Sequence, residues 1–433
     1  MEHGDGTSRS PSAATERLLR LVLGDDAAGM RVVGYDGTEL GDPQATTTLR
    51  ITSPDFLRRV IAGRGSELAF SRAYVAGDVE VEGDIYDILA LRDRIGSIRF
   101  GPSAWRDAAA ALGIHGFDGL TRLRPPPAPP EEINVAGRLH SVRRDAKAIS
   151  SHYDVSNDFY RLFLGPTMTY SCAVFEHAND TLEQAQSNKY ELICRKLGLR
   201  PGMRLLDIGC GWGGMALHAA RQHGVSVVGV TIASEQRDLA RKRVADAGLA
   251  GQIDIRLQDY REVADGPFDA VSSIGMFEHV GSQRLGDYFG RIEQLLTPGG
   301  RLLNHAINYS QPPKKGGPID PDGFMGRYVF PDGELLEPGQ VVSAINSNGL
   351  EVRHLESLRE HYALTLREWV RRLEDNWSEA VRLTSPGRAR VWRLYMAASA
   401  LGFESNELSI TQILASKTDG GDSKMELRPT WGV

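Results

Sequence analysis

The chain has 433 residues and a formal net charge of −6, with 41% hydrophobic and 24% charged residues. This length exceeds what one hydrophobic core usually organises, so we expect two domains, and the composition excludes a disordered or fibrous chain. No apolar run approaches the roughly 20 residues that span a bilayer. The acidic balance argues against a nucleic-acid-binding protein. The first residues lack the basic-then-apolar pattern of a secretory signal, which predicts a cytoplasmic location.

The cysteines and the basic residues add two compositional observations. Cys172, Cys194 and Cys210 are too few for a disulfide framework and lack zinc-finger spacing, so we expect reduced thiols and no metal site. Arginine outnumbers lysine by 42 to 8. Such a bias is typical of a GC-rich genome and is weak evidence about chemistry.

A cluster of prolines divides the chain. The run Pro125-Pro-Pro-Ala-Pro-Pro130 favours an extended spacer and excludes a helix interior. We therefore expect a disordered tail at residues 1–14, an N-terminal α+β accessory domain at 15–120, a linker at 121–138 and a second domain at 139–433. The accessory domain shows strand patterns at 30–35, 47–51 and 79–81 and helical patterns at 56–61, 68–75 and 85–95.

After the linker, strands alternate with helices, which predicts an α/β fold with a doubly wound parallel sheet. The predicted strands are residues 204–208, 226–232, 253–257, 269–274, 301–307 and 408–414. The predicted helices are residues 215–222, 235–247, 284–296 and a long arginine-rich segment at about 365–400.

The strongest local motif is a glycine-rich turn between the first of these strands and its helix. Gly209, Gly211 and Gly213 let the backbone approach a ligand, and the helix N-terminus that follows presents amide donors. A dinucleotide fold uses a similar turn. Here Asp207 precedes the first glycine, which suits a ligand with an ammonium group better than a pyrophosphate. This form resembles the S-adenosylmethionine site of Rossmann-like methyltransferases.

Two further segments suit the same ligand. Thr231 and Gln236 follow the second strand, where a polar side chain would bind the ribose hydroxyls, although the usual acidic residue is absent. Gln258, Asp259 and Tyr260 follow the third strand, where the adenine amine would be recognised. Each segment is equally compatible with a simple helix cap or turn.

Motifs outside the nucleotide site narrow the family. They are His152-Tyr-Asp-Val-Ser-Asn-Asp-Phe-Tyr160, Tyr170-Ser-Cys-Ala173, Gly275-Met-Phe-Glu-His-Val-Gly281, His305-Ala-Ile307 and Phe330-Pro331. From about residue 139 to the C-terminus, they closely resemble the cyclopropane-fatty-acid synthase family of methyltransferases. That resemblance implies a class I methyltransferase fold with a mostly parallel seven-stranded sheet. The segments Ala73-Tyr-Val-Ala-Gly-Asp78 and Gly83-Asp84 resemble the accessory domain of the bacterial phospholipid-acting members.

The resemblance also implies the chemistry. Members transfer the methyl group of S-adenosylmethionine to a cis double bond in a phospholipid acyl chain, and a bound bicarbonate then deprotonates the resulting carbocation. The positions that match the family's bicarbonate site are Cys172, Glu278, His305, the Ile307 backbone and Tyr362. Tyr170 and Ser171 are assigned to the cofactor.

Each assignment has an ordinary structural alternative. Cys172 alone would be a small core residue, Glu278 a helix cap and His305 a hydrogen-bonded core histidine. His361 is a polar competitor of Tyr362.

The carbocation can give two products. Direct ring closure gives a cyclopropane, and a prior hydride shift gives an exocyclic methylene. In actinobacterial relatives, a flavin-dependent partner reduces the 10-methylene product. The arginine bias and Asn308, which stands where relatives usually have glycine beside the base, favour the methylene. A non-catalytic lipid-binding subunit and methylation of a soluble metabolite are the alternatives.

The substrate places the protein at a membrane surface. We expect peripheral, salt-sensitive binding to the anionic inner face of the cell membrane through basic residues that flank the acyl site. These are Arg138, Arg143, Arg144, Lys147, Arg367, Arg371 and Arg372. A solvated helix face is the alternative for these residues. Homo-oligomer formation is left open by the sequence.

Overall fold

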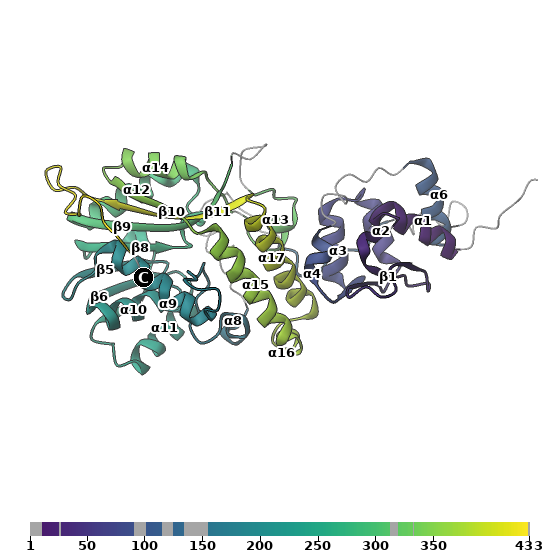
Figure 1. Ribbon diagram of the computed structural model, residues 1–433, viewed down its shortest axis with the longest axis horizontal. Coiled ribbons are helices and arrows are strands. Elements are labelled where there is room, and N and C mark those ends of the chain that lie inside the picture. The colour runs from purple at the N-terminus through teal and green to yellow at the C-terminus, as the bar shows by residue number, and fades with distance from the viewer. Residues whose placement is uncertain are drawn as a thin grey trace, which may run out of the picture. The chain divides into compact units, whose positions relative to one another are not determined.

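The computed structural model describes residues 11–25, 27–90, 101–114, 124–133, 155–311, 319–331 and 333–431, which form two compact units (Figure 1). Unit 1 comprises Met1–Asn134, Asp322–Val329 and Ser385–Ala398. Unit 2 comprises Val135–Pro321, Phe330–Thr384 and Ser399–Val433. Unit 1 therefore includes two short segments from the second half of the chain, which a single division at the prolines does not anticipate.

Unit 1 contains a four-stranded sheet in the order β2-β1-β3-β4. Its strands are β1 (Arg31–Val33), β2 (Glu39–Gly41), β3 (Thr48–Ile51) and β4 (Val79–Glu82). Its helices are α1 (Pro11–Leu23), η1 (Ala27–Gly29), α2 (Asp55–Ala62), α3 (Glu67–Ala76), α4 (Ile85–Leu89), α6 (Pro102–Ala111) and α13 (Phe324–Tyr328).

The N-terminal tail is shorter than the sequence predicts. Residues 1–14 were expected to be disordered, but α1 begins at Pro11 and Ala14 is fully buried. Proline is well tolerated in the first turn of a helix, where its missing N–H would have no partner anyway. The prediction is therefore wrong for residues 11–14, whereas residues 1–10 lie outside the described part of the chain.

The proline segment packs on unit 1. Residues 125–129 form neither helix nor strand. The guanidinium group of Arg59 donates to the carbonyl oxygen of Pro127 at 2.8 Å and forms a buried ion pair with Asp78 at 2.7 Å. Glu132, just beyond the prolines, accepts hydrogen bonds from Arg72 and Tyr328. Prolines have no N–H group, so a run of them cannot form the regular backbone hydrogen bonds of a helix or sheet. A buried arginine is therefore a suitable donor for a carbonyl oxygen in this run.

Unit 2 is built on a seven-stranded sheet in the order β10-β11-β9-β8-β5-β6-β7. Strands β9, β8, β5, β6 and β7 run parallel, and β10 and β11 are antiparallel to their neighbours. The bounds are β5 (Arg204–Ile208), β6 (Ser226–Thr231), β7 (Ile253–Leu257), β8 (Phe268–Ile274), β9 (Leu296–Tyr309), β10 (Glu351–Ser357) and β11 (Leu408–Ser416). The mostly parallel seven-stranded sheet is confirmed, with β10 as a strand that the sequence did not reveal.

Helices cover both faces of this sheet (Figure 1). One face packs against α9 (Leu182–Leu197), α10 (Gly214–His223) and α11 (Ser234–Asp246), and the other against α12 (Leu285–Leu295) and α14 (Pro338–Ser347). Short 3₁₀ helices follow the strands: η3 (Tyr260–Glu262), η4 (Phe277–His279) and η5 (Ser282–Arg284). None of the helices formed by the described residues is long and apolar enough to cross a membrane.

The arginine-rich segment near the C-terminus differs from its prediction. The segment 365–400, expected to be one helix, consists of α15 (Arg359–Asp375), α16 (Trp377–Leu383) and α17 (Pro386–Glu404). The first break lies at Asn376, whose side-chain amide donates to the carbonyl of Arg372. The second break precedes Pro386, because proline disfavours helical backbone in the residue before it. Helix α8 (Asn157–Leu164) begins at the capping hydroxyl of Ser156.

Candidate active site

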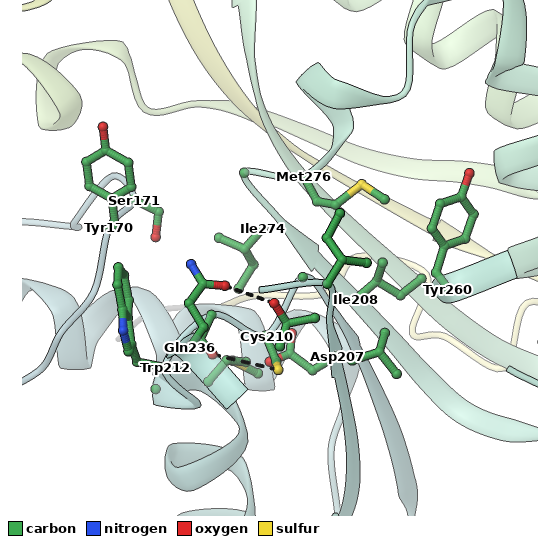
Figure 2. Close-up of a pocket in the computed structure, with 18 of the residues that line it drawn as sticks. Tyr170, Ser171, Asp207, Ile208, Cys210, Trp212, Gln236, Tyr260, Ile274 and Met276 are labelled. Carbon is green, nitrogen blue, oxygen red and sulfur yellow. Dashed lines mark hydrogen bonds between the residues drawn. The ribbon is translucent and has the colours of Figure 1, made fainter. Parts of the chain in front are cut away.

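A pocket in unit 2 lies at the carboxyl ends of β5, β6 and β8 (Figure 2). In a doubly wound sheet, ligands bind where the strand order reverses, which here is between β5 and β8. Figure 2 shows Tyr170 and Ser171 on one side of the pocket and Tyr260 on the other. Ten of the eleven predicted cofactor residues line it: Tyr170, Ser171, Asp207, Gly209, Gly211, Thr231, Gln236, Gln258, Asp259 and Tyr260.

Gly213 is the exception and has a packing role. It caps α10 in the left-handed region, with φ of +79°, and an added Cβ would lie 3.3 Å from the Cβ of Ala240. The next residue, Gly214, lines the pocket, and a Cβ there would lie 2.2 Å from the hydroxyl oxygen of Tyr190. The glycines therefore let α10 approach both α9 and α11 closely.

Asp207 carries a buried carboxylate at the base of the pocket. Its Oδ1 accepts a hydrogen bond of 2.7 Å from the hydroxyl of Ser272, and its Oδ2 has no partner among the described residues. Burial raises the pKa of Asp207 to about 6, against the opposing effect of the Ser272 hydrogen bond and the charge of Lys189. A buried carboxylate oxygen without a partner suits a cationic ligand group.

The two polar segments at the pocket rim differ in the hydrogen bonds and ion pairs that their side chains form. The Thr231 hydroxyl donates to Gln236 Oε1 at 2.9 Å, which leaves the Gln236 amide hydrogens for a ligand. Asp259 instead caps η3 and pairs with the Arg261 guanidinium. Burial favours a higher pKa for Asp259, but these contacts outweigh it and hold the pKa below its ordinary value. Asp259 thus lines the pocket, as the cofactor prediction expects, and it also caps a turn, which is the structural alternative that the sequence left open.

The segment around Ser171 is held by buried polar groups of α9. Lys189 Nζ donates to Ser171 Oγ at 2.9 Å, and Gln186 Nε2 donates to the Ser171 carbonyl oxygen at 2.9 Å. The Tyr170 ring stacks on Trp369 of α15 with 5.3 Å between ring centres. Cys172 is fully buried, and its thiol donates to the Ala173 carbonyl at 3.2 Å.

Lys189 is a site residue that the sequence reasoning missed. Its side chain is fully buried, lines the pocket, and has its pKa lowered to about 7 by burial. Its charge lowers the pKa values of Cys172, Asp207 and His305, so Lys189 lies near these three predicted site residues. The available signal was a lysine on the apolar face of the amphipathic segment that forms α9.

Glu278 and His305 are buried beside this pocket with unpaired polar atoms. Glu278 Oε1 accepts from the Ile307 N–H at 2.8 Å, whereas its Oε2 and both ring nitrogens of His305 have no partner among the described residues. Burial raises the pKa of Glu278 to about 7 and places the pKa of His305 well below its ordinary range. His305 pairs in register with Ile274, which lines the pocket.

These contacts differ from the ordinary structural alternatives. A core histidine would be hydrogen-bonded, but the described residues provide no partner for His305. The Glu278 carboxylate binds the backbone of β9 rather than capping a helix. His361 Nδ1 accepts from the Phe175 N–H at 3.1 Å, so this histidine supports the loop after Cys172. Tyr362 is buried beside Phe403 and Trp369.

The side chain of Asn308 lies on the opposite face of β9 from that of His305. Side chains alternate along β9, and Leu303 packs with α9 and α10 whereas Ala306 packs with α12 and α14. The His305 side chain therefore faces α9 and α10. The Asn308 side chain faces α12 and α14, and its Oδ1 accepts from the Thr411 hydroxyl at 2.6 Å. The expectation that Asn308 lies beside the base stays a prediction.

The predicted basic face is largely neutralised on α15. Arg367 pairs with Glu404, Arg371 with Glu368 and Asp375, and Arg372 with Glu183 and Glu368. This helix therefore matches the alternative of a solvated face. The other four basic residues, Arg138, Arg143, Arg144 and Lys147, lie outside the described residues, as do His152, Tyr153 and Asp154.

The sheet order, the glycine-rich turn and the buried Asp207 together define a class I S-adenosylmethionine-dependent methyltransferase. The family model for mycolic acid cyclopropane synthetase matches residues 140–413. The chain therefore belongs to the cyclopropane synthase family of methyltransferases, and it is an enzyme of that class.

Individual relatives agree with this assignment. The chain is 46% identical over 423 residues to the probable fatty acid methyltransferase Rv3720 of Mycobacterium tuberculosis, covering 96% of this chain and 97% of the relative. It is 33% identical over 374 residues to the cyclopropane-fatty-acyl-phospholipid synthase of Escherichia coli K12, covering 86% and 88%. It is 34% identical over 412 residues to the tuberculostearic acid methyltransferase UfaA1 of M. tuberculosis, covering 93% and 90%.

A solved structure shows the same fold. The mycolic acid cyclopropane synthase CmaA1, complexed with S-adenosylhomocysteine (SAH) and CTAB, matches with a TM-score of 0.59 and 34% identity. The match covers 62% of this chain and 97% of that chain.

Proposed function

We propose that this enzyme methylates the cis double bond of an unsaturated acyl chain in a membrane phospholipid and gives a 10-methylene chain. The observation that carries the proposal is the pair of buried, unpartnered groups beside the cofactor pocket, Glu278 Oε2 and the His305 ring. Polar groups buried without partners are rare, and they are expected where a polar ligand completes the site.

The pocket residues account for binding the methyl donor. S-adenosylmethionine supplies a methyl sulfonium, a strong electrophile. Asp207 Oδ2 would accept from its ammonium group, and the Gln236 amide would donate to its ribose. An alkene is a poor nucleophile, so the surrounding residues have to hold the two reactants in line and exclude water, which would capture a carbocation as an alcohol.

The unpartnered groups fit a bicarbonate ion, which we propose as the base. The Glu278 carboxylate would accept from the bicarbonate hydroxyl, and His305 and Tyr362 would donate to its oxygens. Cys172 would contribute the amide of its turn, because the buried thiol already donates to a carbonyl. Ile307 positions Glu278 through its N–H, so its part is indirect.

The names of the relatives support the proposed substrate class. The E. coli relative acts, by its name, on fatty acyl phospholipid, and the CmaA1 structure holds CTAB, which carries a long alkyl chain. Unit 1 of the present chain has an apolar pocket whose lining includes Phe56, Phe70, Val79 and Ile85. We propose a lipid-binding role for this accessory unit.

Methyl transfer to phospholipid tests the proposed activity. Purified full-length protein with methyl-labelled S-adenosylmethionine and vesicles of dioleoyl phospholipid is expected to place label in the lipid. Vesicles of the saturated phospholipid are the matched control, because they lack the double bond. Absence of transfer under saturating conditions would favour the non-catalytic lipid-binding subunit instead.

The product is read from the same reaction by mass spectrometry with ozonolysis. A methylene is cleaved by ozone to a ketone at the branch carbon, whereas a cyclopropane is not cleaved. The likeness to the tuberculostearic acid methyltransferase and the arginine bias support the methylene, which a flavin-dependent reductase partner would convert to a methyl branch. An ozone-resistant product that is one methylene unit heavier would establish the cyclopropane alternative.

Membrane binding is expected to depend on Arg143 and Arg144 rather than on α15. Each basic residue near an anionic surface contributes about 1 kcal/mol, so reversing both charges should lower vesicle binding at least tenfold. Arg371→Glu is the control, because Arg371 already pairs with Glu368 and Asp375. Co-sedimentation with anionic vesicles measures both; binding insensitive to salt and to the double reversal would contradict inner-face docking through this segment.

A further inference from the structure

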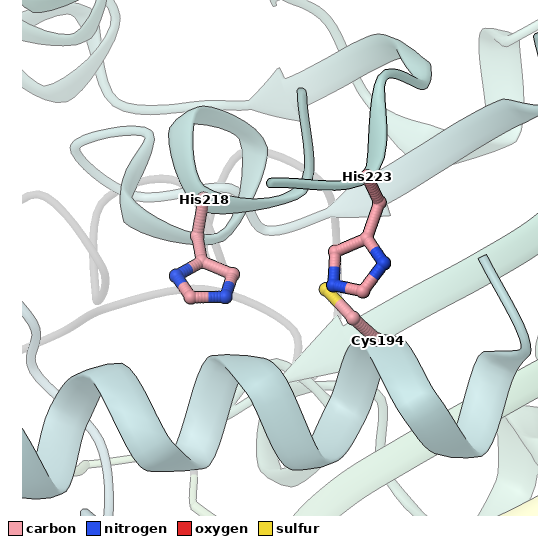
Figure 3. A group of neighbouring side chains, drawn as sticks. All are labelled: Cys194, His218 and His223. Atoms are coloured by element: carbon pink, nitrogen blue, oxygen red, sulfur yellow. The ribbon is translucent and has the colours of Figure 1, made fainter. Parts of the chain in front are cut away.

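A second group of chemically reactive side chains lies between α9 and α10. Cys194 comes from α9, and His218 and His223 come from α10 (Figure 3). One potential ligand atom from each lies within 4.8 Å of the other two. Glu191 of α9 joins them, because its Oε2 lies 3.2 Å from His218 Nε2 and 3.0 Å from His223 Nε2.

The spacing of these residues explains how they meet. Glu191 and Cys194 are three residues apart on α9, so they project from the same face one turn apart. His218 and His223 are separated by four residues, within the interval of about three to five that separates paired zinc-binding histidines. The pattern contains no pair of cysteines, because Glu191 stands where a zinc finger has its first cysteine.

Two of the distances in this cluster are close to those of a tetrahedral metal site. Zinc binds imidazole nitrogen and carboxylate oxygen at about 2.0–2.1 Å, so neighbouring ligand atoms of a tetrahedron lie roughly 3.3–3.4 Å apart. The two distances from imidazole nitrogen to Glu191 Oε2, 3.2 and 3.0 Å, are only slightly shorter. The Cys194 sulfur lies within 4.8 Å of the histidine ligand atoms, so side-chain rotations that bring it closer would complete a set of four ligands around an ion.

Charge and burial also suit a cation. Cys194 is fully buried, and the side chains of His218, His223 and Glu191 are 13%, 18% and 25% exposed, so the cluster is partly accessible to solvent. Burial lowers the pKa of His218 and so favours the neutral, metal-binding imidazole. Burial opposes ionisation of Glu191, but hydrogen bonds from Arg195, His223 and His218 outweigh it and hold its pKa at about 2. Burial raises the pKa of Cys194, so its thiolate needs a cation beside it.

We propose that Glu191, Cys194, His218 and His223 form a tetrahedral site for a divalent transition metal, with zinc as the fitting ion. Thiolate, imidazole and carboxylate are all zinc ligands, and thiolate and carboxylate together neutralise its charge. All four coordination positions are supplied by protein, which is typical of a structural rather than a catalytic zinc site.

The site would brace the cofactor pocket. Lys189 and Tyr190, directly before Glu191 on α9, line that pocket, and so do Gly214 and Met215 at the start of α10. The Tyr190 ring lies 5.8 Å from the His218 ring. A metal that joins the later turns of both helices would therefore hold the earlier turns, which carry the pocket residues, in place.

Metal content and cobalt spectroscopy test the site directly. The full-length protein, made without a polyhistidine tag, is expected to contain one zinc ion per chain by elemental analysis. Cobalt added to the chelator-treated protein should give a thiolate-to-cobalt charge-transfer band and the intense visible bands of four-coordinate cobalt. Cys194→Ser should abolish the charge-transfer band, and His218→Gln should weaken binding at least tenfold.

His177→Gln is the matched control, since His177 is an exposed histidine outside the cluster. It should retain the full cobalt spectrum. Removing zinc should also lower the melting temperature of the wild-type protein by several degrees and weaken S-adenosylmethionine binding, with recovery on adding zinc back. Wild-type protein that gives no charge-transfer band with saturating cobalt, or a Cys194→Ser variant with an unchanged band, would overturn the proposal regardless of how the variants fold.

Discussion

Replacing Glu278 with glutamine is expected to lower the rate of lipid methylation by about 10²–10⁴-fold, the usual contribution of a group that assists proton transfer. Glutamine Oε1 can still accept from the Ile307 N–H, so the side chain keeps its position. Its amide donates hydrogens at the place where the carboxylate oxygen is free to accept. Turnover with labelled lipid measures the rate, and isothermal titration should show an unchanged affinity for S-adenosylmethionine.

The pH dependence provides a second signature of Glu278. Burial raises its pKa to about 7, and the proposed role needs the carboxylate, so the wild-type rate should fall as the pH drops below about 7. This loss should be absent from the residual activity of the glutamine variant. The bicarbonate concentration has to be held constant across the series, because its own protonation changes in the same range.

The free energy of unfolding of the Glu278→Gln variant shows whether a loss of activity comes from misfolding. Because the folded-state pKa of Glu278 is raised, the folded protein binds more protons than the unfolded chain between about pH 4.5 and 7, and the free energy of unfolding falls as pH rises through this window. The uncharged glutamine avoids that loss, so the variant should be at least as stable as the wild type at pH 8.

Glu379→Gln, at a surface ion pair with Arg382, is the control for activity. A Glu278→Gln variant that keeps more than a tenth of the rate would exclude this role.

Replacing Asp207 with asparagine is expected to weaken S-adenosylmethionine binding by about 30-fold or more. Truncating one partner of a buried charged hydrogen bond costs at least about 2 kcal/mol, and every 1.4 kcal/mol changes a dissociation constant about tenfold. Asparagine Oδ1 can keep the hydrogen bond from Ser272, so the fold should be retained. Isothermal titration measures the dissociation constant, and thermal unfolding checks the stability.

The choice of ligand makes this test specific. S-adenosylmethionine and S-adenosylhomocysteine both carry the ammonium group, so both should be weakened equally, whereas adenosine, which lacks it, should bind as it does to the wild type. Asp246→Asn, at the exposed end of α11, is the control. If Asp207→Asn bound S-adenosylmethionine within threefold of the wild type, Asp207 would not be the partner of the ammonium group.

Much of the fold could be predicted because local patterns carry it. The bounds of β5 and β7 agree with the sequence prediction, since short apolar runs between glycines and helices mark buried parallel strands. Strand β10 was missed because it lies at the sheet edge and none of its residues is buried, so it lacks an apolar pattern. The break between α15 and α16 was missed because an amphipathic pattern continues across it.

The amino-acid sequence by itself determined the alternation of strands and helices, the glycine-rich turn and the family of the enzyme, because these depend on residue types at short, regular spacing. Only the tertiary structure decided which distant side chains meet. The face of β9 on which Asn308 lies depends on strand pairing, and the burial of Lys189 depends on how α9 packs. Cys194 and the two histidines belong to different helices, and only close packing permitted by the glycines brings them together.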